Sequence, residues 1–120
     1  MSRILAVDDS RSMREMVAFT LTSAGFHVAQ AEDGAIGLEL ARKEKFGLVL
    51  VDVNMPNMDG IALIKALRGE ADYKFTPMLM LTTEAAADRK QEGKAAGATG
   101  WIVKPFNPDQ LVAVVQKVLR

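Results

Sequence analysis

Short apolar runs alternate with longer amphipathic stretches along the whole chain. The apolar runs predict strands at residues 4–7, 26–31, 48–52, 78–82 and 100–103. Apolar positions at helical spacing predict helices near 12–24, 33–43, 59–68, 84–96 and 108–119. This alternation is typical of βαβ units, in which helices connect parallel strands. We therefore predict an α/β fold with five strands and five helices.

Residue types that begin and end helices lie close to these boundaries. Ser10 or Ser12 can cap the start of the first helix, and Gly25 suits its end. Asp59 is placed to cap the third helix. Because connections between parallel strands are right-handed, the helices should cover both faces of the sheet. The unbroken apolar run at 78–81 agrees with a sheet buried on both sides.

The same spacing predicts which side chains face the core and which face solvent. Phe19 falls among the apolar positions of the first helix, and the second helix should bury Ile36. Arg89, Lys90 and Lys94 are expected to form a solvated face of the fourth helix.

Composition narrows the functions open to this chain. At 120 residues, 49% hydrophobic and 25% charged, it has enough apolar material for the core of one domain, which we expect to span residues 1–120. Its 15 Lys and Arg balance 15 Asp and Glu, so no overall field favours nucleic acid or an anionic membrane. It has no cysteine, no signal-type segment and no apolar stretch of membrane-spanning length. We therefore expect a soluble cytoplasmic protein.

Four of the predicted strands end in side chains that carry chemistry. Asp8 and Asp9 follow the first apolar run, and Asp52 ends the third. Thr82 ends the fourth, and Lys104 follows the fifth. Because the carboxyl ends of parallel strands meet at one edge of a sheet, where open α/β proteins bind ligands, these side chains should share one crevice. A single aspartate at a strand end is usually a solvated loop residue, but this combination favours a site.

The chemistry of the crevice favours magnesium and a phosphate. Three carboxylates repel one another in a partly desolvated crevice unless a cation lies among them. Mg²⁺ prefers oxygen ligands and keeps several of its waters, so two carboxylates and a carbonyl suffice. The only histidine is His27 and there is no cysteine, which argues against zinc. Lys104 would then face a phosphate oxygen beside the metal.

Several motifs together resemble the CheY-like receiver domains of two-component response regulators, and the resemblance covers the whole chain. They are VDDS at 7–10, DVNMP at 52–56, MDG at 58–60, LT at 81–82, GA at 97–98, GW at 100–101 and VKPF at 103–106. The resemblance implies a flavodoxin-like, doubly wound (βα)5 fold with a parallel sheet in the order 2-1-3-4-5.

The resemblance also implies a role for each acid. Asp52 would be the nucleophile that takes a phosphoryl group from the phosphohistidine of a sensor histidine kinase. Asp9 would bind Mg²⁺ directly and Asp8 chiefly through water, and Asp52 would share the metal. The backbone carbonyl of Asn54 would complete the ligands. Beyond this self-phosphorylation and its own dephosphorylation, we expect no enzymatic turnover.

The remaining matching residues imply a switch. Lys104 would bind the phosphoryl group and precede a cis peptide bond to Pro105. The hydroxyl of Thr82, which strand register favours over Thr83, would move onto a phosphoryl oxygen. Trp101, where the family usually carries Tyr or Phe, would change rotamer in step; the competing interpretation makes it a half-buried packing aromatic. The change would alter the surface of the fourth helix, fifth strand and fifth helix, which partners would read.

Within the family, the stretch at 9–14 and the pairing of Asn54 with Glu84 recur in chemotaxis regulators, so we predict a single-domain CheY-type receiver. Its downstream target would be a protein such as the flagellar motor switch, and we expect a monomer, with a dimer through the same surface left open. Alternatives are a receiver in a phosphorelay or other pathway, a docking module that is no longer phosphorylated, and part of a longer DNA-binding regulator. A Mg²⁺-dependent phosphohydrolase fits less well, because Asn54 stands where such enzymes carry a second aspartate as general acid.

Overall fold

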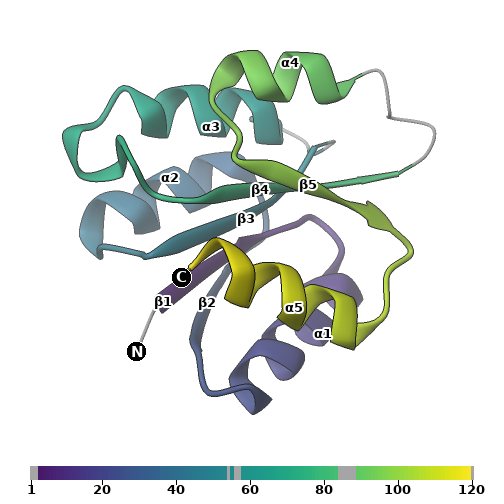
Figure 1. The fold of residues 1–120 in the computed structure, drawn as a ribbon. Helices are drawn as coiled ribbons and strands as arrows, with labels where there is room; N and C mark the ends of the chain where they lie inside the picture. The colour runs from purple at the N-terminus through teal and green to yellow at the C-terminus, as the bar shows by residue number, and fades with distance from the viewer. Residues whose placement is uncertain (1–2, 54, 56–57, 84–88, 120) are drawn as a thin grey trace.

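The computed structural model describes residues 3–53, 55, 58–83 and 89–119, drawn in colour in Figure 1. The five strands are β1 (Arg3–Val7), β2 (His27–Ala31), β3 (Leu48–Asp52), β4 (Met78–Thr83) and β5 (Gly100–Lys104). The helices are α1 (Arg11–Ser23), α2 (Gly34–Lys43), α3 (Gly60–Arg68), the short 3₁₀ helix η1 (Ala71–Tyr73), α4 (Arg89–Ala96) and α5 (Pro108–Val118). The predicted alternation is confirmed, apart from η1, which the sequence pattern did not predict. The first part of the predicted fourth helix, residues 84–88, lies outside the described residues.

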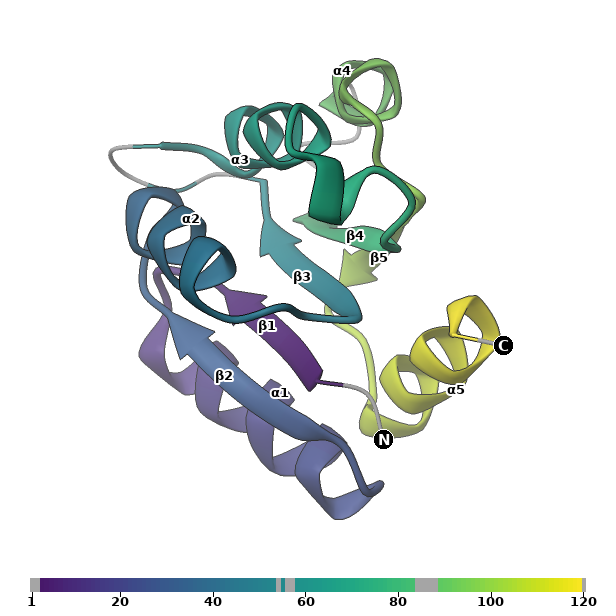
Figure 2. The same cartoon turned by 90° about the vertical axis from the view of Figure 1, so that its left-hand side faces the viewer.

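The strands form one parallel sheet in the order β2-β1-β3-β4-β5. Figure 2 shows α1 and α5 on one face of this sheet and α2, α3 and α4 on the other. The prediction of a doubly wound (βα)5 fold is therefore confirmed. Among the described residues, no helix is both long enough and apolar enough to cross a membrane.

Two hydrophobic cores lie on opposite faces of the sheet because successive strand side chains point in opposite directions. In β4, Met78 and Met80 pack toward α3 and α4, whereas Leu79 and Leu81 pack toward α1 and α5. All five residues of β3 are buried. This double burial explains why the central strands are continuous apolar runs.

Two apolar side chains that the helical spacing placed toward the core lie at the surface instead. Phe19 is 76% exposed and Ile36 is 36% exposed. The buried side of α1 is set by Val17 and Leu21, and Phe19 is about 200° around the helix from Val17. In α2, Gly37 faces the sheet so closely that a Cβ there would lie 3.0 Å from Val7, which turns the neighbouring Ile36 outward.

The predicted caps hold the helices at the edge of the sheet where β-strands end. The side chain of Ser10 accepts a hydrogen bond from the backbone N–H of Met13 and caps α1, which settles the choice between Ser10 and Ser12. Asp59 caps α3 through the N–H of Ala62, 2.9 Å away. Gly25 follows α1 with φ +101°, a conformation that favours glycine.

Candidate functional site

The acidic side chains predicted from the strand ends converge at the carboxyl edge of the sheet. Asp8 and Asp9 follow β1, and Asp52 is the last residue of β3. One carboxylate oxygen from each lies within 4.8 Å of the other two. We call these three residues the acidic cluster. Their backbones come from adjacent strands, because β1 pairs directly with β3.

The three carboxylates differ in burial. Asp8 is 2% exposed and Asp52 is 9% exposed, whereas Asp9 is exposed to solvent. The N–H of Asp8 donates to the carbonyl of Ala31, which extends the pairing of β1 with β2 by one residue and keeps Asp8 in the interior. The Oδ1 of Asp8 also accepts a hydrogen bond from the N–H of Ser10. A rigid turn therefore presents one buried and one exposed carboxylate side by side.

Lys104, the last residue of β5, places its ammonium between the two buried acids. Its Nζ lies 3.2 Å from Oδ2 of Asp8 and 3.2 Å from Oδ1 of Asp52. Its side chain is 16% exposed, so these contacts are formed largely out of water. The peptide bond from Lys104 to Pro105 is cis, as the family resemblance implies.

The single ammonium of Lys104 does not neutralise the negative charge of the acidic cluster. Burial, and then the negative charge of Asp8, raise the pKa of Asp52 from 3.8 to about 6, although Lys104 acts in the opposite direction. The site thus holds excess negative charge at neutral pH. A cation bound to its exposed side would relieve that excess.

The donor set fits magnesium. It consists of three carboxylates within reach of one ion, one of them exposed and therefore open to a hydrated metal. Three carboxylates face the single ammonium of Lys104, and this excess of negative charge favours a divalent cation. Asn54, whose carbonyl is the fourth expected ligand, lies outside the described residues.

Thr82 and Trp101 lie on neighbouring strands at the same edge. Thr82 is 2% exposed and its hydroxyl donates to the carbonyl of Thr83, whereas Thr83 itself is exposed. The β4–β5 register pairs Thr82 with Val103 and Trp101 with Met80, so the indole starts two residues before the partner of Thr82, on the same face. Trp101 is 40% exposed, which places its ring outward.

The structure adds contacts of basic side chains that sequence spacing did not indicate. Arg14 donates to the backbone carbonyl of Asp8 at 2.7 Å. Arg89 forms an ion pair with Asp59 at 3.2 Å, and the Nζ of Lys90 lies 5.3 Å from the ring centroid of Trp101. The prediction of a solvated basic face on the fourth helix is therefore wrong for Arg89 and Lys90. It is confirmed for Lys94, which is exposed.

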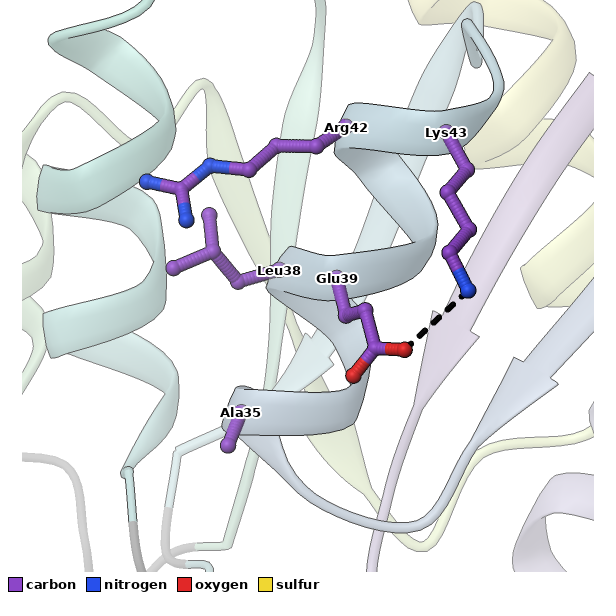
Figure 3. Close-up of a pocket in the computed structure, with 5 residues that line it drawn as sticks. All are labelled: Ala35, Leu38, Glu39, Arg42 and Lys43. Atoms are coloured by element: carbon purple, nitrogen blue, oxygen red, sulfur yellow. Dashed lines mark hydrogen bonds and ion pairs between the residues drawn. The ribbon is translucent and has the colours of Figure 1, made fainter.

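A separate hollow lies over α2, away from the acidic cluster. Ala35 and Leu38 form part of its lining, with Glu39, Arg42 and Lys43 (Figure 3). Lys43 is paired with Glu39 at 3.2 Å, and Arg42 reaches Glu70 of the neighbouring segment at 2.7 Å. Because both basic groups already have acidic partners, this hollow is a poor anion site.

Comparisons with known proteins show which family and which solved structures this chain resembles. The model of the response regulator receiver domain family matches residues 4–116. Chemotaxis protein CheY-3 of Vibrio cholerae is 40% identical over 117 residues, which cover 97% of this chain and 90% of that protein. Chemotaxis protein CheY of Pseudomonas aeruginosa is 38% identical, with 97% and 94% covered. The solved structure of V. cholerae CheY4 matches with a TM-score of 0.95 and 55% identity, over 99% of each chain.

Proposed function

Because the chain belongs to the response regulator receiver family and is of the CheY type, we propose that it is a phosphorylation-dependent switch that takes a phosphoryl group onto Asp52. The observation that carries the proposal is the position of Asp52, which is buried at a strand end, with the ammonium of Lys104 between it and Asp8. The donor would be the phosphohistidine of a sensor histidine kinase.

In the proposed reaction, an oxygen of Asp52 attacks the phosphorus of the phosphohistidine. The new O–P bond forms as the N–P bond breaks, and the imidazole nitrogen leaves with the bonding electron pair. Mg²⁺, held by Asp8, Asp9, Asp52 and the carbonyl of Asn54, would neutralise charge on the transferred group. The Nζ of Lys104, now 3.2 Å from Asp52, is in place to contact a phosphoryl oxygen on that carboxylate.

The response would begin at Thr82. Its hydroxyl, which now bonds a backbone carbonyl, would turn to a phosphoryl oxygen, and Trp101 would move inward toward the space beside it. The surface of α4, β5 and α5 would change with it, because Trp101 lies on β5 beside α4. A protein target reads that surface; by similarity to the chemotaxis relatives we propose the flagellar motor switch. We propose that the domain acts as a monomer in the cytoplasm.

The decisive experiment is covalent labelling by a small phosphodonor. Incubation with acetyl phosphate and Mg²⁺ should add one phosphoryl group per chain, measured by intact mass, and chelation of the metal should prevent it. Asp52→Asn should abolish the label, whereas Asp72→Asn, at an exposed position in η1, should leave it unchanged. The label should be stable in acid and lost in base, as an acyl phosphate is.

Two results would contradict this function. One is a label that persists in Asp52→Asn. The other is sustained turnover of a phosphomonoester by the wild-type protein, which would favour the phosphohydrolase alternative. Binding of the beryllofluoride-treated protein to isolated flagellar switch protein, compared with untreated protein, would separate the chemotaxis target from those of other pathways.

A further inference from the structure

A cation–π contact connects α4 to the edge strand. The Nζ of Lys90 lies 5.3 Å from the centroid of the Trp101 ring, within the range at which an ammonium is attracted to an indole face. Lys90 is half-buried, and Trp101, at 40% exposed, is held outward. The two residues come from different elements, so the contact joins the helix to the strand.

The helix that carries Lys90 is itself fixed in position. Arg89, its neighbour in the sequence, is paired with Asp59, the cap of α3. One turn later, Gly93 lies so close to β4 that a Cβ there would meet the sulfur of the buried Met80 at 2.2 Å. Met80 is the register partner of Trp101. Lys90 therefore approaches the indole from a support that cannot easily follow the ring if the ring moves.

We propose that Lys90 is a positioning residue that holds Trp101 in its outward position through this cation–π contact and thereby opposes formation of the phosphorylated state. The inference rests on the proposed function, because it concerns the equilibrium of the same switch. Inward movement of the indole separates it from Lys90, so the contact stabilises only the outward state. Phosphorylation of Asp52 must overcome this preference for the outward state. The apparent affinity of the site for a phosphoryl analogue is therefore lower than it would be without the contact.

The sign of the effect distinguishes this role from simple electrostatics. Loss of a positive charge near an anion site should weaken anion binding. By contrast, loss of a contact that holds the indole ring outward should strengthen anion binding. An exposed cation–π contact corresponds to about a two- to fivefold change in an equilibrium constant.

The test compares three variants by titration with beryllofluoride, a stand-in for the phosphoryl group, at saturating Mg²⁺. Trp101 is the only tryptophan, so its fluorescence reports directly on the switch. Lys90→Met should lower the half-saturating concentration about two- to fivefold. Lys90→Arg keeps a cation over the ring and should resemble the wild type. Lys94→Met removes the same charge from an exposed position of α4 and should leave the value unchanged or slightly higher. Circular dichroism checks that each variant is folded.

The outcomes separate this inference from the proposed function. If the wild type is labelled by acetyl phosphate and responds to beryllofluoride, but Lys90→Met has an unchanged or higher half-saturating concentration, the role of Lys90 is refuted alone. An equal strengthening in Lys94→Met would refute it as well, since that residue does not contact the ring. A wild type that is neither labelled nor responsive would overturn the proposed function and this inference together.

Discussion

Replacement of Asp52 by asparagine should make the protein more stable at neutral pH. In the absence of metal, burial and the nearby charge of Asp8 raise the pKa of Asp52 to about 6, so its ionised form is disfavoured in the folded state. Asparagine has nearly the same shape, carries no charge and can still accept a hydrogen bond from Lys104, which retains its contact with Asp8. The variant therefore removes the cost of the buried charge with little change in packing.

The pKa gives the magnitude and the pH range of this effect. Asp52 titrates near 3.8 when unfolded and near 6 when folded, a difference that corresponds to about 3 kcal/mol. Below pH 3.8 the carboxyl is protonated in both states and costs nothing. Between the two pKa values the folded state binds more protons than the unfolded state, so the free energy of unfolding falls as the pH rises. Because the surroundings relax, we expect a gain of about 1 to 3 kcal/mol for Asp52→Asn at pH 8.

Urea denaturation in the presence of a chelator, at several pH values from 4.5 to 8, measures this difference. The gap between Asp52→Asn and the wild type should be largest at pH 8 and should shrink toward pH 4.5. Asp9→Asn serves as the control, because the same chemical change at an exposed carboxylate should have a much smaller effect. An Asp52→Asn variant that is less stable than the wild type at pH 8, or a gap independent of pH, would refute the reasoning.

Three further predictions concern packing, a buried hydroxyl and the metal. Gly60→Ala should lower the free energy of unfolding in urea by about 1 to 3 kcal/mol, because the added Cβ would lie 2.2 Å from the carbonyl oxygen of Asp52. Gly69→Ala, at the other end of α3, is the control and should be nearly neutral. Equal effects of the two substitutions would contradict this prediction. Tyr73→Phe should lower the free energy of unfolding by about 1 to 2 kcal/mol in the same assay, because the lost hydroxyl hydrogen-bonds to three buried or partly buried backbone groups. An unchanged urea midpoint would contradict this prediction. Mg²⁺ at a hundred times its Kd should stabilise the wild type by about 2.7 kcal/mol, measured as a rise in Tm of several degrees. Asp9→Asn should lose most of this rise. An equal rise in the variant would show that Asp9 is not a metal ligand.

The order of strands and helices could be predicted because a sheet buried on both faces needs strands that are continuous apolar runs, and such runs are easily recognised in the sequence. The bounds of β3 at Leu48–Asp52 were predicted correctly, since every residue of that strand is buried. Helix faces were harder to predict. Phe19 satisfies the helical spacing of α1 as well as its neighbours do, but the rotation of the helix against the sheet leaves it exposed. That rotation depends on the packing of the whole face and not on the local pattern.

The 3₁₀ helix η1 shows a similar limit. It is only three residues long, too short for a periodic signal, and it forms because Tyr73 reaches back under the segment that follows α2. The hydroxyl of Tyr73 donates to the carbonyl of Ala41 at 2.7 Å and accepts from the N–H of Phe46 at 3.2 Å. These partners are 27 to 32 residues away in the sequence. No local pattern could have paired them.

The sequence predicted that the acidic side chains at the strand ends lie together, but it did not predict how they differ in burial. Asp8 and Asp9 are the same residue type at adjacent positions, so the sequence cannot say which is buried. The bond from the N–H of Asp8 to Ala31 continues the β1–β2 pairing, which keeps Asp8 inside and turns Asp9 to solvent. This difference in burial matters for the proposed function: buried Asp8 raises the pKa of Asp52, while exposed Asp9 leaves one side of the cluster open to solvent. If both aspartates were buried, the cluster would have no carboxylate open to a hydrated cation.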